Sequence, residues 1–461
     1  MKFKRLISLI MSAIMVVMLC STTAFAAKKC VALNKTSASV TVGKSITLKP
    51  TVTGVKNYTL QWSTSDKTIA TVSKSGKVTG VKAGNVTVTV KIKDTKYKAS
   101  CKVTVKKASA VSSSDNTSKN TAASSGDALD FVKNIKIGWN LGNTLDCTGS
   151  WINGDLAHET AWGNPKTTEE MIKAVKKAGF NAVRIPTSWG EHLDSKNNIS
   201  KEWLDRVQTV IDYAYKNDMY VILNTHHETD WIIPSKDSKE MSERFTSIWK
   251  QIAERFKDYD EHLIFEGLNE PRTVGSANEW NSGTADERKV INKYNKLFVE
   301  TVRKSGGNNK LRYLMITPYC ANSGGAAIND LEIPDDSRII ISVHAYLPYN
   351  MALNTGSKVS SFTDNDKQEI DSMFKRLSDK FISKGIPVIV GEFGSVNKKN
   401  DAERAKLAKY YVSAAKKAGV PCFWWDNGND SSSGEAFLLL NRKTAKMEHD
   451  KIVKALMEGL K

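Results

Sequence analysis

The sequence lacks two features that would each point to a different class of protein. It has no long apolar run after Leu6–Leu19, so no membrane-spanning segment is expected. Its six cysteines lack the close pairing of metal-binding motifs, so no cysteine metal site is expected. Outside the first hundred residues the cysteines are isolated, and we interpret Cys147, Cys320 and Cys422 as buried thiols.

Acidic residues are nearly absent from one short region. Residues 28–107 contain seventeen Lys but only Asp66 and Asp94, whereas residues 108–461 are balanced in charge. The net charge of +18 therefore belongs to the N-terminal part of the chain, which argues against a nucleic-acid enzyme. An anionic cell envelope or acidic polysaccharide is a candidate partner for this region. The alternative interpretation is a solvated Lys-rich surface.

The first residues have the pattern of a secretory signal peptide. Basic residues precede the apolar run Leu6–Leu19, which is too short for a membrane span, and Ala24-Phe25-Ala26 follows as a cleavage pattern. We therefore expect residues 1–26 to be a signal peptide cleaved near Ala26/Ala27, and the mature chain to be secreted and extracellular. An uncleaved anchor is the alternative.

Residues 27–106 show short runs of alternating apolar and polar residues, rich in Val, Ile and Thr and separated by turn signals. This pattern predicts a small all-β sandwich. The stretches Trp62–Asp66, Ile69–Val72 and Gly76–Gly80 resemble bacterial immunoglobulin-like domains of group 2. A disulfide between Cys30 and Cys101 is expected if the first and last strands are neighbours. Residues 107–126 are rich in Ser, Ala and Thr and are predicted to be a linker.

Residues 127–461 alternate short apolar runs with amphipathic stretches, which predicts an α/β fold, a (β/α)8 TIM barrel. The predicted strands are Ile135–Leu141, Ala182–Pro186, Tyr220–Thr225, Leu263–Leu268, Tyr313–Thr317, Ile339–His344, Val388–Gly391 and Cys422–Trp425. The predicted helices include Glu169–Ala178, Lys201–Lys216, Ser238–Phe256, Lys289–Lys304, Gln368–Lys384 and Ala402–Ala418. Only the segment between Thr317 and Ile339 lacks a clear helical pattern.

Polar residues gather at the C-terminal ends of seven of the eight predicted strands. These ends open on one face of a parallel barrel, where barrel enzymes place their active sites. Two of the polar residues are the carboxylates Glu270 and Glu392. A retaining glycosidase needs such a pair, one as acid/base and one as nucleophile, about 5 Å apart. The sequence therefore predicts that Glu270 and Glu392 are catalytic.

The other polar residues at the strand ends are candidates for binding substrate. Arg184 and Tyr346 are suited to hold the nucleophilic carboxylate, and Asn269 to bond a sugar 2-hydroxyl. The full set of substrate-binding candidates is Asn140, Arg184, His226, His227, Asn269, His344, Tyr346 and Trp425. Strand alternation allows only one of Trp424 and Trp425 to face the barrel mouth. Five further tryptophans in presumed loops are candidates for the walls of a sugar cleft, namely Trp151, Trp162, Trp189, Trp231 and Trp280.

The motifs around these residues resemble glycoside hydrolase family 5, in particular its subfamily 4 of bacterial endoglucanases. The resemblance rests on Gly138–Asp146, Glu159–Pro165, Arg184–Pro186, His226–Glu228, Phe265–Arg272, Ser342–Tyr346, Gly391–Gly394 and Trp424–Gly428. It implies a retaining double displacement on internal β-1,4-glucosidic bonds in cellulose, mixed-linkage glucan or xyloglucan. It also implies that Glu270 is the acid/base and Glu392 the nucleophile. A β-mannanase or xylanase of the same family is the alternative.

Two further hypotheses remain from other classes. A metal-dependent hydrolase is suggested by His226-His227, but adjacent strand residues point in opposite directions and would not share one metal ion. A non-catalytic carbohydrate-binding or adhesion protein is suggested by the immunoglobulin-like segment. For the hydrolase, the sequence predicts a β-glucan polysaccharide as substrate, no cofactor or metal, no nucleic-acid partner and a monomeric state.

Overall fold

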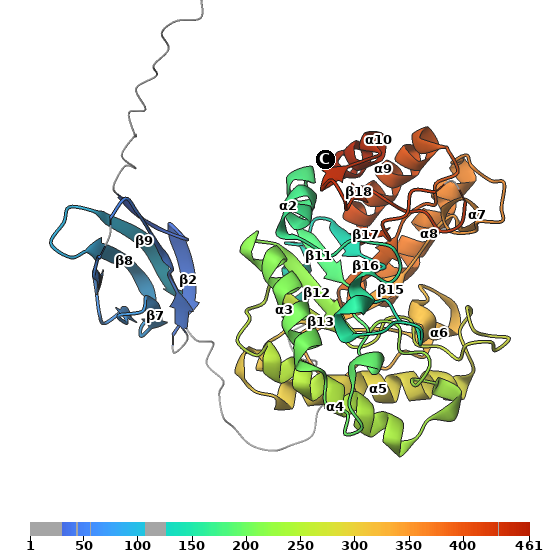
Figure 1. Cartoon of the computed structure of the whole chain (residues 1–461), viewed down its shortest axis with the longest axis horizontal. Coiled ribbons are helices and arrows are strands. Elements are labelled where there is room, and N and C mark those ends of the chain that lie inside the picture. Colours follow the sequence, from blue (N-terminus) through green and yellow to red (C-terminus); the bar gives the residue numbers. More distant parts are fainter. Residues whose placement is uncertain (1–29, 43–44, 56, 107–125, 432) are drawn as a thin grey trace, which may run out of the picture. The chain divides into compact units, whose positions relative to one another are not determined.

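The computed structural model describes residues 30–42, 45–55, 57–106, 126–431 and 433–461. These residues form two compact units, a small β-structure and a barrel (Figure 1). The predicted signal peptide and nearly all of the predicted linker lie outside the described residues. None of the helices among the described residues is long and apolar enough to cross a membrane.

The first unit is a β-sandwich. A four-stranded sheet has the order β2-β9-β8-β5, a three-stranded sheet the order β3-β7-β6, and β1 pairs with β4. Val40, Leu48, Val78, Val88 and Val103 are among the buried residues between the sheets. The strands are β1 (Cys30–Leu33), β2 (Ser37–Thr41), β3 (Ser45–Thr47), β4 (Pro50–Thr53), β5 (Leu60–Thr64), β6 (Ala70–Val72), β7 (Lys77–Gly80), β8 (Gly84–Ile92) and β9 (Lys98–Lys106).

The predicted disulfide is wrong, because Cys30 and Cys101 are both free thiols. Strand β9, which carries Cys101, hydrogen-bonds to β2 and β8, whereas β1, which carries Cys30, hydrogen-bonds to β4. The side chain of Cys101 points into the core of the sandwich, and Cys30 is exposed. The two cysteines therefore belong to different strand pairs and different environments.

The second unit is a closed barrel of eight parallel strands whose order in space follows the chain from β10 to β17 (Figure 1). Each predicted strand is present, and the boundaries differ by up to three residues. The strands are β10 (Gly138–Leu141), β11 (Ala182–Ile185), β12 (Tyr220–Asn224), β13 (Leu263–Glu266), β14 (Leu314–Ile316), β15 (Ile339–His344), β16 (Val388–Phe393) and β17 (Cys422–Asp426). A short hairpin, β18 (Leu440–Asn441) and β19 (Lys446–Met447), follows the last barrel strand.

Helices surround the barrel as the amphipathic patterns predict. They are α2 (Glu169–Ala178), α3 (Lys201–Lys216), α4 (Lys239–Arg255), α5 (Ala285–Lys304), α6 (Gly325–Asn329), α7 (Tyr349–Ala352), α8 (Asp364–Lys380), α9 (Asp401–Ala418) and α10 (Asp450–Gly459). The segment without a clear helical pattern holds the short α6 and the 3-10 helix Tyr319–Ala321. Short 3-10 helices occur at Asp155–Thr160, Gly190–His192, Pro234–Lys236, Gly307–Lys310, Tyr319–Ala321 and Ile382–Lys384.

Two helix boundaries show how local sequence sets the ends of the helices. Helix α5 begins four residues earlier than predicted, because Thr284 and Glu287 form a capping box that satisfies the first free N–H groups. Helix α9 ends at Gly419, whose φ of 71° is left-handed and closes the helix at little steric cost. Helix α1 (Gly126–Val132) was not predicted, because the sequence before the first strand is short and lacks a full helical repeat.

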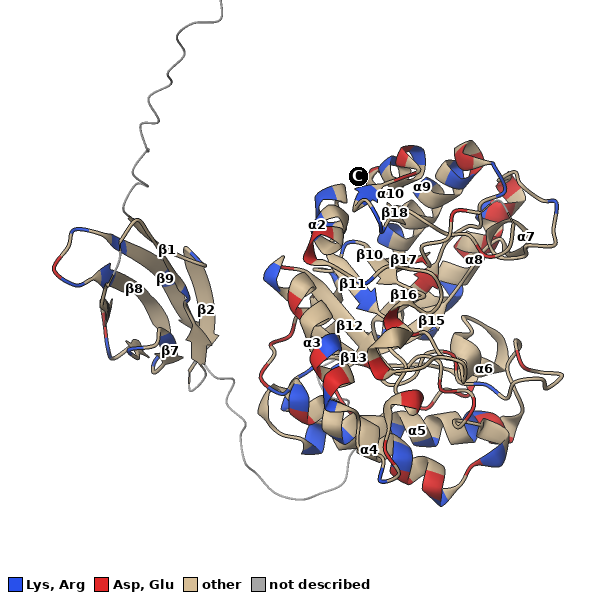
Figure 2. Cartoon of the chain, in the orientation of Figure 1, with Lys and Arg blue, Asp and Glu red and all other residues tan. Residues whose placement is uncertain are grey.

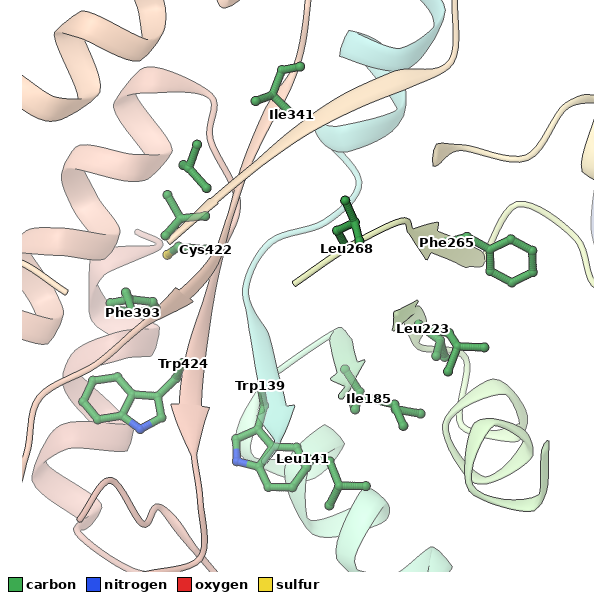
Figure 3. Packing of buried hydrophobic residues seen from close by; sticks show 14 of the residues in the cluster. Trp139, Leu141, Ile185, Leu223, Phe265, Leu268, Ile341, Phe393, Cys422 and Trp424 are labelled. Carbon is green, nitrogen blue, oxygen red and sulfur yellow. The ribbon is translucent and has the colours of Figure 1, made fainter. Parts of the chain in front are cut away.

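The barrel has an outer and an inner core. Outward-facing strand residues, among them Trp139, Leu223 and Trp424, pack against the surrounding helices (Figure 3). Inward-facing residues such as Ile222, Ile264 and Ile340 fill the barrel interior together with Phe131 and Val132 of α1. The apolar side chains of helix α1 therefore pack against the lower layer of inward-facing strand residues. Above this apolar layer the inward-facing positions become polar, and the functional site begins there.

Candidate active site

A fully buried polar layer crosses the barrel toward the C-terminal ends of the strands. It consists of the inward-facing residues Asn140, Arg184, Asn224, Glu266 and Ser342, none of which is exposed. Arg184, Asn224, Glu266 and Ser342 each lie two residues after an apolar inward-facing residue of the same strand, as the two-residue period of a strand requires. Buried polar groups must be hydrogen-bonded, so this layer is organised by its internal contacts.

Arg184 is the centre of the polar layer. Its Nε donates to Oε2 of Glu266 at 2.7 Å, Nη1 to Oε1 of Glu392 at 2.7 Å, and Nη2 to Oδ1 of Asn269 at 2.7 Å. Nη1 also donates to Oδ1 of Asn140 at 3.1 Å. Burial opposes the charge of Arg184, but the carboxylates of Glu266 and Glu392 raise its pKa above the ordinary value. The guanidinium stays charged and fixes four neighbouring side chains.

Glu392 is held by two donors. Besides the hydrogen bond from Arg184, its Oε2 accepts the hydroxyl hydrogen of Tyr346 at 2.8 Å. The bonds from Arg184 and Tyr346 stabilise the ionised carboxylate and fix its orientation. Burial, followed by the negative charge of Glu392, raises the pKa of Tyr346 well above its ordinary value, so the hydroxyl remains a donor. Glu392 is thus a carboxyl group whose orientation is fixed by two hydrogen bonds near the end of an apolar strand.

Glu270 lies across from Glu392. His344 Nδ1 is 2.7 Å from Oε1 of Glu270 and 3.7 Å from Oε2 of Glu392. One carboxylate oxygen of each glutamate and Nδ1 of His344 all lie within 4.8 Å of one another. Carboxyl groups of retaining glycosidases are about 5 Å apart, whereas inverting enzymes leave room for a water molecule at about 6.5–9.5 Å. The separation in this chain fits direct attack by one of the two carboxylates.

The charges around Glu270 set its protonation. Burial raises the pKa of Glu270, but the hydrogen bond and charge of His344 and the charge of Arg272 lower it below the ordinary value overall. Burial likewise opposes the charged form of His344, and the carboxylates of Glu392 and Glu270 raise its pKa above the ordinary value. His344 therefore couples the two glutamates electrostatically.

The tautomer of His226 follows from its neighbour Asn224. Asn224 Oδ1 accepts the backbone N–H of Thr187, so its Nδ2 is the donor, both to Oε2 of Glu266 at 3.0 Å and toward Nδ1 of His226 at 3.1 Å. Nδ1 of His226 is consequently an acceptor, and its Nε2 carries the proton. Burial lowers the pKa of His226 well below its ordinary value. His226 is a neutral hydrogen-bond donor through Nε2.

The prediction that His226 and His227 point in opposite directions is wrong. Both follow the end of β12 at Asn224, where strand alternation no longer applies, and their rings meet edge to face at 4.5 Å. Asp146, His226 and His227 each offer one ligand atom within 4.8 Å of the others. A metal ion there would need the lone pair of His226 Nε2, the atom that the Asn224 contact leaves protonated. The donor set therefore fits a sugar hydroxyl better than a metal ion.

Trp425, not Trp424, faces the barrel mouth. The Trp425 ring is parallel to that of His226, with an interplanar angle of 2° and centroids 5.7 Å apart. Trp424 points the other way, packs among the outer core residues and donates from Nε1 to the carbonyl of Phe437 (Figure 3). The sequence left open which of the two tryptophans faces the mouth, and the orientation of the two side chains on β17 decides for Trp425.

The tryptophans predicted to line the cleft divide into two groups. Trp189 is fully buried and donates to the carbonyl of Asn224, and Trp231 donates from Nε1 to Glu228. Trp162 is half-buried, whereas Trp151 and Trp280 are 71% and 59% exposed. Of these five tryptophans, Trp151 and Trp280 have the largest exposed ring surfaces.

Two predicted substrate-binding residues, Asn140 and Arg184, are fully buried. Nδ2 of Asn140 donates to the carbonyl of Gly391 at 3.0 Å, and Arg184 donates to Oδ1 of Asn140 and to Glu392. Both therefore position neighbouring residues of the site. Sequence reasoning also missed Glu266, which accepts hydrogen bonds from Arg184, Asn224 and Ser342 Oγ. The available signal was its inward strand position, two residues after Ile264.

Comparison with known proteins agrees with this geometry. Residues 145–431 match the family model described as cellulase, glycosyl hydrolase family 5. Residues 28–103 match the model of the bacterial Ig-like domain, group 2. Endoglucanase A of Clostridium longisporum is 47% identical over 361 residues, which cover 77% of this chain and 70% of the relative.

Solved structures show the same similarity. A GH5-4 broad specificity endoglucanase from Ruminococcus champanellensis with bound cellotriose matches with a TM-score of 0.70 and 47% identity, over 72% of this chain and 98% of that chain. A family 5 xyloglucan-specific endo-β-1,4-glucanase from a metagenomic library, in complex with cellotriose, matches with a TM-score of 0.68 and 45% identity. The match covers 71% of this chain and 98% of that chain. The chain, with its (β/α)8 barrel and paired glutamates, belongs to glycosyl hydrolase family 5.

Proposed function

We propose that Glu392 is the nucleophile and Glu270 the acid/base of a retaining endo-β-1,4-glucanase. The observation that carries this proposal is the approach of the two carboxylates to within 4.8 Å, one of them fixed by Arg184 and Tyr346. In the first step Glu392 attacks the anomeric carbon, and the bond to the leaving sugar oxygen breaks as Glu270 donates a proton to it. In the second step Glu270 removes a proton from water, which attacks the same carbon and releases Glu392.

Neighbouring donors are arranged to bind the reacting sugar. Oδ1 of Asn269 accepts from Arg184, which leaves the amide nitrogen of Asn269 to donate to the 2-hydroxyl. His226 contributes the Nε2 proton, and His227 is partly exposed beside it. Trp425 provides a flat apolar face for the pyranose ring. Binding at these donors strengthens as charge develops in the transition state.

The test is covalent labelling. A cellobioside with fluorine at carbon 2 and a good leaving group should form a stable ester on Glu392, identified by mass spectrometry of peptides. Glu392→Gln should abolish turnover on carboxymethylcellulose without unfolding the protein, because the amide has the same shape but is a poor nucleophile. Glu332→Gln, an exposed glutamate, is the matched control. Labelling at another carboxylate, or inversion of the product anomer, would refute the assignment.

The preferred substrate is proposed as cellulose-like β-1,4-glucan, with mixed-linkage glucan and xyloglucan also accepted. The similarity to endoglucanases and to a xyloglucan-specific enzyme supports this range. Rates of hydrolysis on a panel of β-glucan, xyloglucan, glucomannan and xylan will distinguish the proposed β-1,4-glucanase from a β-mannanase or a xylanase. A protein that binds these polymers but releases no reducing ends would be the non-catalytic alternative.

The basic sandwich is proposed to hold the secreted, monomeric enzyme on a polyanionic polysaccharide or envelope surface. Lys91 and Lys98 lie directly opposite each other at exposed positions of β8 and β9, and Lys102 follows on the same face of β9. Figure 2 shows basic residues, in blue, on these two strands. Like charges placed opposite one another repel, and a polyanion would relieve that repulsion. Retention on a polyuronate resin, lost at high salt and weakened by changing these three Lys to Gln, tests the proposal. Equal retention of a Lys133→Gln control is expected.

A further inference from the structure

The ammonium group of Lys398 lies within a shell of backbone carbonyl oxygens. Four of these oxygens lie at hydrogen-bond distance from Nζ, namely those of Asn350 at 2.7 Å, Asn354 at 3.0 Å, Ser357 at 2.9 Å and Val359 at 3.0 Å. An ammonium group has three N–H donors, so at least one of them is shared between two carbonyls. The shell therefore resembles the oxygen coordination of a metal cation. Burial lowers the pKa of Lys398, as expected for a cation enclosed by protein.

The four carbonyls belong to one stretch of chain at the C-terminal face of the barrel. This stretch leads from β15, which ends at His344, to helix α8, and after the short α7 it forms no helix or strand up to residue 363. Lys398 lies on the next connection, between β16 and α9. Its ammonium group thus links the two connections that follow the strands of His344 and Glu392.

Two further hydrogen bonds between these connections hold the ends of the same stretch. The backbone N–H of Val396 donates to the carbonyl of Ala352 at 3.0 Å. Nδ2 of Asn400 donates to the carbonyl of Ser360 at 2.7 Å. Three of the four carbonyls that Lys398 binds lie between these two points. The ammonium group therefore holds the middle of the stretch.

The stretch bound by Lys398 reaches the active site through Leu353. Leu353 packs against the same buried cluster as Tyr346, and this cluster includes Trp425. Tyr346 donates to Glu392, and Trp425 is stacked at the barrel mouth. A stretch without helix or strand has little local stability of its own. The contact of Leu353 with these side chains consequently depends on what holds the stretch in place.

We propose that Lys398 is a positioning residue, a cation built into the chain that fixes residues 350–359 and, through Leu353, the side chains of Tyr346 and Trp425. This inference rests on the roles proposed above for Tyr346 and Trp425. It predicts that removal of the ammonium group loosens the stretch and slows turnover in an enzyme that is otherwise folded.

Trypsin measures the loosening without involving catalysis. Lys358 is exposed and lies between Ser357 and Val359, whose carbonyls Lys398 binds. The Lys358–Val359 bond should resist trypsin in the wild-type protein and be cut roughly tenfold faster or more in Lys398→Met, because cleavage follows the population of the opened segment. Fragment masses identify this cut. Lys399→Met, at the adjacent exposed lysine, is the matched control and should leave the cut at the wild-type rate.

Turnover per active site measures the effect on the reaction. In Lys398→Met, kcat on carboxymethylcellulose should fall roughly tenfold, since a misplacement of about 1 Å costs up to a hundredfold. The number of sites titrated by the 2-fluoro cellobioside should stay at the wild-type value. A variant that is only partly unfolded would instead have fewer sites, each with the wild-type kcat.

A free amine supplies the missing cation to Lys398→Ala. This variant lacks the part of the side chain that n-propylammonium replaces, so the amine should restore both trypsin resistance and kcat. Tetramethylammonium carries the same charge without N–H donors and should restore neither, and wild-type enzyme with each cation is the control. If Lys398→Met does not fold, Lys398→Ala is purified with n-propylammonium and compared before and after dialysis.

The outcomes separate this inference from the proposed function. An unchanged trypsin cut in Lys398→Met, a faster cut with unchanged kcat, or no effect of n-propylammonium on Lys398→Ala would each overturn the role of Lys398. The catalytic assignment is tested separately by Glu392→Gln, which must be inactive with intact trypsin resistance. If Glu392→Gln stayed active, the catalytic pair would fail, whatever the trypsin result for Lys398.

Discussion

Arg184 Nη1 donates a 2.7 Å hydrogen bond to Oε1 of Glu392 and so joins the second barrel strand to the seventh. The same guanidinium holds Glu266 and Asn269 through its other nitrogens. A fork of this kind cannot be replaced by a single ammonium group, because only the planar guanidinium presents donors in several fixed directions.

Arg184→Lys should therefore lower kcat/KM on carboxymethylcellulose roughly tenfold to a hundredfold, the worth of one lost hydrogen bond to a charged group. Steady-state kinetics on the purified variant provide the measurement. Arg376→Lys, on an exposed side chain that donates to the carbonyl of Ser323, serves as control and should keep wild-type rates. A fully active Arg184→Lys enzyme would show that the fork does not orient Glu392.

Glu266→Gln should destabilise the fold. Glu266 is fully buried and accepts three hydrogen bonds, from Arg184, Asn224 and Ser342. A glutamine at this position leaves the charge of Arg184 partly unpaired. Its amide N–H₂ group also faces at least one of these donors in place of an acceptor. Breaking a buried ion pair costs about 3–5 kcal/mol. Denaturant unfolding of the variant measures the change. Glu300→Gln breaks an exposed helix pair with Lys304, and its effect should stay below about 0.5 kcal/mol.

Arg272→Gln should shift the pH profile. Burial raises the pKa of Glu270, whereas His344 and Arg272 lower it, so removing the Arg272 charge raises the pKa again. The acid must be protonated in the first step, and a higher pKa keeps it protonated at higher pH. The alkaline limb of kcat/KM should consequently move to higher pH, measured with an aryl cellobioside. A limb that moves to lower pH would contradict the sign of the Arg272 effect.

Trp424→Phe and Trp425→Phe should affect different properties. Trp424 is fully buried, and losing its Nε1 leaves the Phe437 carbonyl without that donor, at a cost of about 1–3 kcal/mol of stability. Trp425 lies at the mouth, so its change should lower kcat/KM several-fold through weaker stacking. Thermal unfolding and kinetics on both variants give the comparison. The reverse pattern would place the sugar on Trp424.

Removal of residues 28–126 should leave kcat on soluble glucan within roughly twofold of the full chain, because the barrel has its own core. A longer deletion, to residue 133, also removes α1, whose Phe131 and Val132 pack with the inward-facing barrel residues. That second variant should lose stability. A large loss of kcat already in the shorter variant would mean that the sandwich helps to form the site.

The sequence determined the fold and most of the site, for local reasons. Apolar runs with a two-residue period alternate with amphipathic helical repeats, and this pattern alone predicted all eight barrel strands and the principal helices. Residues at the C-terminal ends of parallel strands must open on one face, so Glu270, Glu392 and Tyr346 were predicted to lie together without any coordinates.

Other properties depend on the orientation of side chains and on their contacts with other strands, which the local sequence does not determine. Only the tertiary structure showed that Asn140 and Arg184 lie beneath the site, that Glu266 completes their network, and that Cys30 and Cys101 belong to different strand pairs. The tautomer of His226 and the choice of Trp425 likewise follow from contacts between residues far apart in the chain. Pattern along the chain fixes which elements form, whereas hydrogen bonds across the barrel decide what each side chain can do.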